Sequence, residues 1–281
     1  MISTTDVRLD DDRTLRVHDS AAGTHGAFTV LWHHGSPQTG APLTPLVSAA
    51  EERGIRLLSY GRPGYGGSSP NDGRTVGSAA RDVEQLADAL GVGRFAVLGA
   101  SGGGPHALAC AALLPDRVTG AASLAGLAPF DAAGIDWFAG MASGGASLRA
   151  ARLGRRQREV YEETSEFDPE SFNERDYAAL AVDWASLAED VGVASAQGSG
   201  GLIDDDLAFV APWGFGVTDI STPVLVVQGG QDRVVPPSHG DWLMRSVRRS
   251  ELWYRPLDGH ISVLGASALA MDWLLAHAAD R

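Results

Sequence analysis

The chain contains 281 residues, of which 35 are acidic and 22 are basic, and its formal net charge is −13. A chain of this length can bury a large core, and its acidity argues against nucleic acid or an anionic membrane surface as the main partner. The single cysteine, Cys110, excludes an intrachain disulfide and a cysteine-based zinc cluster, and its apolar neighbours predict a buried, unreactive thiol. Every basic residue is arginine, which excludes mechanisms that need lysine.

The first segment, residues 1–13, holds four aspartates and no apolar stretch, and no later segment has about 20 unbroken apolar residues, the length of a membrane span. We therefore expect a cytoplasmic protein that acts on a small molecule, without a nucleic-acid or membrane partner. A monomer or a homodimer is expected.

The N-terminal half begins with two segments of alternating polarity, residues 5–9 and 14–19, which predict an antiparallel hairpin. Apolar runs and helical spacing then alternate along the chain. The predicted order is strand 28–32, helix 43–53, strand 55–60, helix 76–90, strand 94–98, helix 105–114 and strand 118–124. Such alternation predicts a parallel sheet with helices on both faces.

The C-terminal part repeats this alternation with strand 223–228, helix 239–247, strand 252–255 and helix 266–279. Between residues 124 and 223 no strand pattern occurs. Helical spacing is found there in residues 136–141, 147–164, 175–187 and 188–197. The sequence therefore predicts an α/β core of eight mostly parallel strands, residues 1–130 and 216–281, with an inserted helical cap at 131–215.

A Gly-x-Ser-x-Gly pattern, Gly99–Gly103, lies between a predicted buried strand and a predicted helix. A serine hydroxyl becomes a good nucleophile when it stands clear of the sheet, beside a base and near amide donors. A tight strand-to-helix turn provides that position, and Gly99 and Gly103 lack the side chains that would clash in it. The pattern predicts that Ser101 is a nucleophile.

Such a serine needs an imidazole to accept its proton and a carboxylate to orient that imidazole. Asp232 follows the predicted strand 223–228, and His260 follows the predicted strand 252–255. Both therefore belong to loops at the carboxyl ends of strands, where an open parallel sheet gathers its functional residues.

Four motifs occur in the order typical of one family: His33–Pro37, Gly99–Gly103, Gly230–Asp232 and Gly259–His260. With them the chain resembles the α/β-hydrolase fold-1 family over nearly its full length. The resemblance implies that Ser101 is the nucleophile, His260 the general base and then acid, and Asp232 the orienting carboxylate.

The same resemblance implies that the main-chain N–H groups of Ser36 and Gly102 form the oxyanion hole. The segment Tyr60–Ser68 is similar to the family's Asp-Arg-x-Gly-x-Gly-x-Ser loop, but Gly61 replaces the usual aspartate. This departure predicts a looser loop beneath the oxyanion turn and no loss of chemistry.

Asp131 is the alternative acid, and Asp232 is preferred because its motif match is fuller. Of His33 and His34 we expect one to line the pocket and the other to pack, without a shared metal ion, since adjacent residues of an extended chain point to opposite sides. His106, one turn into the following helix, is expected to be structural.

Two charged runs, Asp204–Asp206 and Arg152–Arg158, are predicted to be solvated faces of the cap, with a calcium site or a docking patch as the alternative. Candidate substrate contacts are His34, Trp137 and Trp184. Further apolar cap residues could line a hydrophobic pocket or only hold the cap on the core: Phe138, Met141, Tyr161, Trp213 and Phe215.

The tight strand-to-helix turn carries a serine. An aspartate in its place would displace halide or open an epoxide. The serine therefore predicts acyl transfer, which needs no metal and no organic cofactor. We expect hydrolysis of a small carboxylic ester or amide. A proline iminopeptidase-like aminopeptidase is an alternative with a partial match, because His-Gly-Ser-Pro-Gln stands where those enzymes carry His-Gly-Gly-Pro-Gly. Lyases, perhydrolases, acyltransferases and ligand-binding receptors on the same fold are further alternatives.

Overall fold

The structure is a computed structural model that describes residues 2–21 and 27–278. Within these ranges eight strands form one sheet in the order β1-β2-β4-β3-β5-β6-β7-β8. β2 pairs antiparallel with β1 and β4, and the other neighbouring strands pair in parallel. The strands are β1 (Ser3–Arg8), β2 (Thr14–Asp19), β3 (Thr29–His33), β4 (Arg56–Tyr60), β5 (Phe95–Ala100), β6 (Val118–Leu124), β7 (Val224–Gly229) and β8 (Ser250–Arg255). The predicted α/β fold is confirmed.

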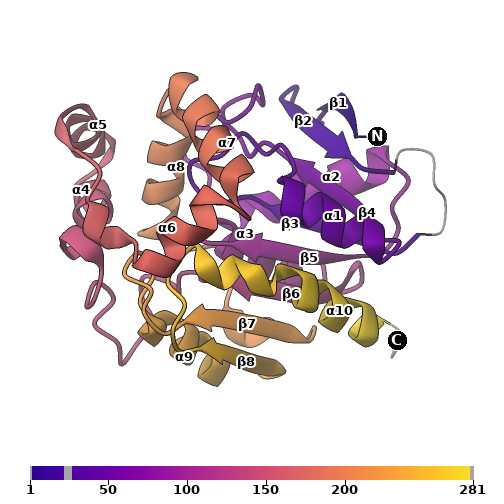
Figure 1. Cartoon of the computed structure of the whole chain (residues 1–281). Coiled ribbons are helices and arrows are strands. Elements are labelled where there is room, and N and C mark those ends of the chain that lie inside the picture. Colours follow the sequence, from indigo (N-terminus) through magenta and orange to yellow (C-terminus); the bar gives the residue numbers. More distant parts are fainter. Residues whose placement is uncertain (1, 22–26, 279–281) are drawn as a thin grey trace.

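Helices cover both faces of the sheet (Figure 1). On one face lie α1 (Thr44–Glu52) and α10 (Ser267–Ala278), and on the other lie α2 (Ser78–Ala89), α3 (Gly103–Leu113) and α9 (Pro237–Ser246). Because successive strand residues point to opposite faces, Val97 of β5 joins the core beneath α2 and α3, whereas Leu98 joins the core beneath α1 and α10. Two short 3₁₀ turns complete this part of the chain, η3 (Val217–Asp219) and η4 (Ser262–Ala266).

The chain between β6 and β7 is helical, and Figure 1 shows its helices together beyond the carboxyl ends of the parallel strands. They are η1 (Ala142–Gly145), α4 (Ala146–Arg152), α5 (Arg155–Thr164), η2 (Pro169–Ser171), α6 (Glu174–Ala181), α7 (Ala185–Ala196) and α8 (Gly200–Phe209). No helix of the described ranges has both the length and the apolarity needed to cross a membrane.

Several predicted helix boundaries in this region are wrong. Residues 136–141 form turns, and the predicted helix 147–164 is interrupted at Gly154, whose φ of 108° is not helical. The predicted helix 175–187 ends at Ala181. Helix α8 was not predicted, since its glycines and consecutive aspartates are typical of a loop. The last residue of the predicted helix 266–279 lies outside the described residues.

The turn between β5 and α3 depends on two glycines. A Cβ atom on Gly99 would overlap the carbonyl oxygen of Gly103, and one on Gly103 would overlap the carbonyl oxygen of His33. Between them Ser101 has a φ of 52°, a left-handed conformation that costs a non-glycine residue of order 1 kcal/mol. The close approach of β3 to this turn therefore holds a strained serine at the end of β5.

Replacing Gly99 by alanine should lower the free energy of unfolding by about 2–3 kcal/mol or more, because rigid backbone atoms occupy the space of the new methyl group. Gly93→Ala is the matched control, since no atom lies within 4 Å of its Cβ position. Urea denaturation of both variants measures the difference. Equal losses of stability would contradict this account of the turn.

Candidate active site

Three side chains from separate loops meet at the end of β5. The Nε2 atom of His260 lies 2.9 Å from Ser101 Oγ, and its Nδ1 atom lies 2.8 Å from Asp232 Oδ2. A carboxylate only accepts hydrogen bonds, so we assign the proton to Nδ1, which leaves Nε2 free to accept the Ser101 hydroxyl proton. The structure thus brings together all three residues that the sequence singled out.

The loop after β7 fixes the orientation of Asp232. Its Oδ1 atom accepts hydrogen bonds from the main-chain N–H groups of Val234 and Val235, at 2.9 and 2.8 Å, while Oδ2 faces His260. Asp131, the alternative acid, is exposed, and the carboxylate that contacts the imidazole is that of Asp232.

Burial shifts the pKa of His260 downward, but the charge of Asp232 and its hydrogen bond act in the opposite direction and prevail. The charge of Asp176 adds to this effect, and the net pKa is raised above its ordinary value. The carboxylate therefore favours the charged imidazolium that proton transfer from a serine would create.

Asp176 of α6 holds the loop that carries His260. It is completely buried, and its carboxylate accepts hydrogen bonds from the main-chain N–H groups of His260, Ile261 and Ser262 at 2.8–3.1 Å. The side chain of Ser262 donates another hydrogen bond at 2.8 Å. A residue from the segment between β6 and β7 thus positions the imidazole, and the sequence pattern gave no sign of it.

The loop after β3 lies directly against the serine turn. A Cβ atom on Gly35 would lie 3.6 Å from Ser101 Cβ, and one on Gly102 would overlap Ser36 Oγ. Within the described residues, the main-chain N–H groups of Ser36 and Gly102 have no hydrogen-bond acceptor in the protein. Two donors are therefore available beside the serine, on the residues that the sequence predicted.

His33 and His34 are both completely buried, and the expectation that one of them lines the substrate pocket stays a prediction. The ring of His34 is engaged at both nitrogens: Nδ1–H donates to Gly35 O at 2.6 Å, and Nε2 accepts from Arg62 N at 3.1 Å. His106 is structural as expected, with Nδ1 at 2.7 Å from Gly102 O, and burial lowers its pKa to about 3.

Both candidate tryptophans pack inside the protein. Trp137 is 5% exposed, donates its indole N–H to Ala128 O at 2.9 Å and packs edge-on against His239. Trp184 is 3% exposed and belongs to the core beneath α1 and α10. Packing explains both positions, so their contact with a substrate stays a prediction.

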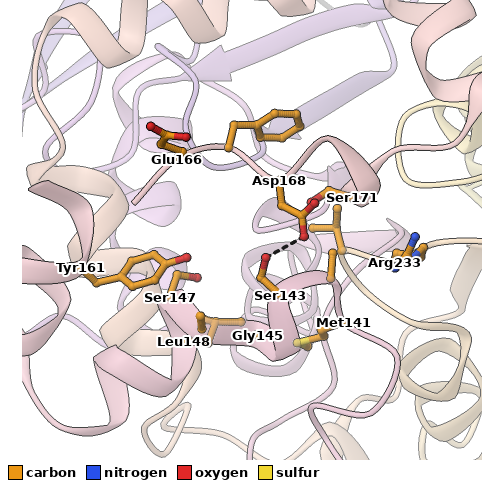
Figure 2. A pocket seen from close by; sticks show the side chains of 14 residues that line it. Met141, Ser143, Gly145, Ser147, Leu148, Tyr161, Glu166, Asp168, Ser171 and Arg233 are labelled. Carbon is orange, nitrogen blue, oxygen red and sulfur yellow. Dashed lines mark hydrogen bonds between the residues drawn. The ribbon is translucent and has the colours of Figure 1, made fainter. Parts of the chain in front are cut away.

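A cavity of about 230 Å³ lies beside the loop that carries Asp232 (Figure 2). Met141 and Tyr161, two of the apolar residues expected to line a pocket, line it together with Arg233, which follows Asp232 in sequence. Across the cavity Ser143 donates a hydrogen bond to Asp168 at 2.7 Å. The cavity therefore has polar groups from the segment between β6 and β7 beside apolar surface.

The run Asp204–Asp206 on α8 is buried, so its prediction as a solvated face is wrong. Asp204 pairs with Arg155 and Asp206 with Arg158, at 2.6 Å for the second pair, so that the two charged runs face each other. Burial raises the pKa of Asp206 to about 6, against the opposing effect of Arg158. The central residue, Asp205, is completely buried beside the loop after β3.

The segment Tyr60–Ser68 makes several hydrogen bonds despite the glycine at position 61, and its expected looseness stays a prediction. Ser68 Oγ donates to Gly61 O at 2.6 Å, and the Arg62 guanidinium donates to the carbonyl oxygens of His34 and Gly35. Arg62 thereby holds the loop after β3, which carries the N–H group of Ser36.

Comparisons with known proteins show which family the fold belongs to. A family model described as alpha/beta hydrolase fold matches residues 29–265. A 2-hydroxy-6-oxononadienedioate/2-hydroxy-6-oxononatrienedioate hydrolase of Klebsiella pneumoniae is 29% identical over 250 residues, 85% of this chain and 83% of the relative. A hydrolase of the same name from Burkholderia vietnamiensis is 27% identical over 90% of this chain and 87% of its own length.

Two solved structures share the fold. A hydrolase from Pseudomonas aeruginosa PA01 superposes with a TM-score of 0.74, at 22% identity and with 98% of each chain covered. A thermophilic esterase from Thermogutta terrifontis superposes with a TM-score of 0.71, at 22% identity, over 98% of this chain and 99% of the other.

Removing the charge of Asp232 should lower the pKa of His260, since burial then acts without its main opponent. NMR titration of the imidazole signals in wild type and Asp232→Asn measures the shift, with His260→Ala to assign the signal. His106, whose pKa burial lowers to about 3, should stay neutral above pH 5 or so in all three proteins. An unchanged or higher pKa of His260 in Asp232→Asn would contradict the coupling.

Proposed function

Because the chain belongs to the α/β-hydrolase family, we propose that it is a serine hydrolase that cleaves a small carboxylic ester through an acyl-enzyme. The observation that carries the proposal is the continuous hydrogen-bonded path from Ser101 Oγ through His260 to Asp232, with links of 2.9 and 2.8 Å. The same contacts would serve an amide substrate.

In the proposed reaction Ser101 Oγ attacks the carbonyl carbon while its proton passes to Nε2 of His260. The N–H groups of Ser36 and Gly102 hold the resulting oxyanion, and Asp232 stabilises the imidazolium. Collapse of the tetrahedral intermediate breaks the ester C–O bond, and the leaving alkoxide takes the proton from His260. Water then attacks the acyl-enzyme by the same route, releasing the acid and restoring Ser101.

We assign substrate selection to the segment between β6 and β7, as a helical cap of residues 131–215 on a core of residues 1–130 and 216–281. Its position beyond the carboxyl ends of the strands supports this assignment (Figure 1). The cavity lined by Met141, Tyr161 and Arg233 is the candidate region for the acyl or alcohol group (Figure 2).

A second candidate substrate is an oxo-dienedioate, the compound class that the names of the two similar hydrolases contain. Such a substrate carries two carboxylates and needs cationic partners. The buried arginines of the cap and its neighbouring loop are already paired: Arg62 and Arg74 with Asp205, and Arg158 with Asp206. Arg233, which lines the cavity, is likewise paired, with Glu170 at 3.3 Å, and these pairs favour an uncharged ester over a dianion.

Ser101 should be the one residue that a fluorophosphonate labels, because the base beside it activates this hydroxyl. Intact-mass analysis is expected to give a single adduct on the wild type and none on Ser101→Ala or His260→Ala. Absence of an adduct on the folded wild type would contradict the hydrolase proposal and favour a receptor or a lyase.

Asp232→Asn should lower kcat for an activated ester by about 10³–10⁴-fold, because the imidazole loses the group that fixes its tautomer. Asp131→Asn, a change in an exposed carboxylate, is the matched control and should stay near the wild-type rate. A large loss of kcat in Asp131→Asn with little loss in Asp232→Asn would show that Asp131 is the carboxylate that orients the imidazole.

p-Nitrophenyl esters of increasing chain length and a 2-hydroxy-6-oxo-dienedioate, compared by kcat/KM, separate the two substrate candidates. The proposal expects the neutral esters to be the better substrates by about tenfold or more, since a dianion finds no unpaired buried arginine among Arg62, Arg74 and Arg158. A preference for the dioate would overturn the ester assignment while leaving the serine mechanism in place.

A further inference from the structure

Asp205 joins the helical segment to the loop that carries the Ser36 amide. Its Oδ2 atom accepts hydrogen bonds from Ser36 Oγ at 2.5 Å, from Arg62 Nη2 at 2.7 Å and from the Tyr65 hydroxyl at 2.8 Å. Its Oδ1 atom lies 2.7 Å from Nη2 of Arg74. A carboxylate that is completely buried therefore has four polar partners, all of them on loops of the core.

The chain of contacts continues from Asp205 to the peptide that joins Gly35 and Ser36. The guanidinium of Arg62 donates to Gly35 O at 3.3 Å and to His34 O, and its Nη2 also lies 2.9 Å from Ser36 Oγ. Because the carbonyl and N–H of a trans peptide point in opposite directions, donors that hold Gly35 O also direct the N–H of Ser36. His34 Nδ1–H is a second donor to the same oxygen, at 2.6 Å.

Charge also favours this arrangement. Burial by itself would raise the pKa of Asp205, but Arg62 and Arg74 hold it well below its ordinary value, so the carboxylate stays ionised. Two guanidinium groups against one carboxylate leave a positive charge behind the oxyanion loop. Such a charge stabilises an oxyanion, and Asp205 keeps the two guanidinium groups in fixed directions.

We propose that Asp205 is a positioning residue for the oxyanion hole, through which the helical segment fixes the direction of the Ser36 N–H. The inference rests on the proposed serine-hydrolase function and deepens it, because it makes docking of α8 a condition for stabilising the tetrahedral intermediate. Asp205 touches neither the reacting serine nor the imidazole; it acts through Arg62 and through the side chain of Ser36.

Three variants test the proposal. Asp205→Asn removes the charge, and Ser36→Ala removes only the hydroxyl contact while keeping the main-chain N–H and the pair between Arg62 and Asp205. Asp206→Asn is the matched control, because this neighbouring residue of α8 is also buried but pairs with Arg158, away from the oxyanion loop. Thermal unfolding of each variant shows whether it is folded.

The readout is kcat and KM for an activated ester, together with the inhibition constants of an alkyl boronic acid and of the planar carboxylic acid product. A misdirected oxyanion donor weakens binding of the tetrahedral boronate and lowers kcat. In Asp205→Asn we expect both the boronate affinity and kcat to fall by about 10–100-fold, while KM and the affinity for the product stay within about threefold of the wild-type values. Ser36→Ala should show the same pattern with a smaller loss, and Asp206→Asn should show none of it.

Equal losses of boronate and product affinity in Asp205→Asn, or the same pattern in Asp206→Asn, would overturn the positioning role and leave the hydrolase in place. If Asp205→Asn fails to fold, the Ser36→Ala result decides: a wild-type ratio of boronate to product affinity overturns the proposal. Wild-type protein that neither hydrolyses esters nor takes an adduct on Ser101 overturns the proposed function, and the inference falls with it.

Discussion

The close approach of the β3 end to the serine turn is the constraint on which the rest of the site depends. A side chain at Gly103 would collide with the carbonyl oxygen of His33, and one at Gly99 would collide with Gly103. With both absent, the loop that follows β3 packs against Ser101, whose left-handed backbone turns its hydroxyl out of the sheet. Every later contact, from the imidazole of His260 to the amide of Ser36, requires this spacing.

Two buried carboxylates of the helical segment hold the loops that lie around Ser101. Asp176 holds the loop of His260 through main-chain N–H groups, and Asp205 holds the loop of Ser36 through Arg62. A buried charge is costly unless hydrogen bonds or opposite charges satisfy it, and both residues meet this condition with several partners. Two loops that have to face Ser101 are therefore both attached to the same helical segment.

The sequence was sufficient to predict the sheet and the three residues that meet at the carboxyl ends of its strands, Ser101, Asp232 and His260. Strands β5 and β7 are buried on both faces, so their apolar runs are clear, and Ser101 and Asp232 lie in the loops that follow them. His260 lies in the loop after β8, a partly exposed strand at the end of the sheet. The glycine pattern around Ser101 is local as well, because Gly99 and Gly103 report the sterics of a single turn.

The parts that could not be predicted depend on partners far apart along the chain. The run Asp204–Asp206 has the composition of a solvated loop. Its burial depends on pairing with arginines at positions 155, 158, 62 and 74, which are distant in the sequence. Likewise, nothing local distinguishes Asp176 from any other helix-start carboxylate. The contacts of His34 are of the same kind, because its two ring nitrogens bind the main chain of Gly35 and of the distant Arg62.

A crystal structure of the protein after reaction with a fluorophosphonate tests the central claim most directly. The account predicts phosphorus on Ser101 Oγ, with the phosphoryl oxygen about 2.7–3.1 Å from the main-chain nitrogens of both Ser36 and Gly102. It also predicts that the side chains of Asp205 and Arg62 keep their contacts. A phosphoryl oxygen turned away from either nitrogen, or phosphorus on a residue other than Ser101, would contradict it.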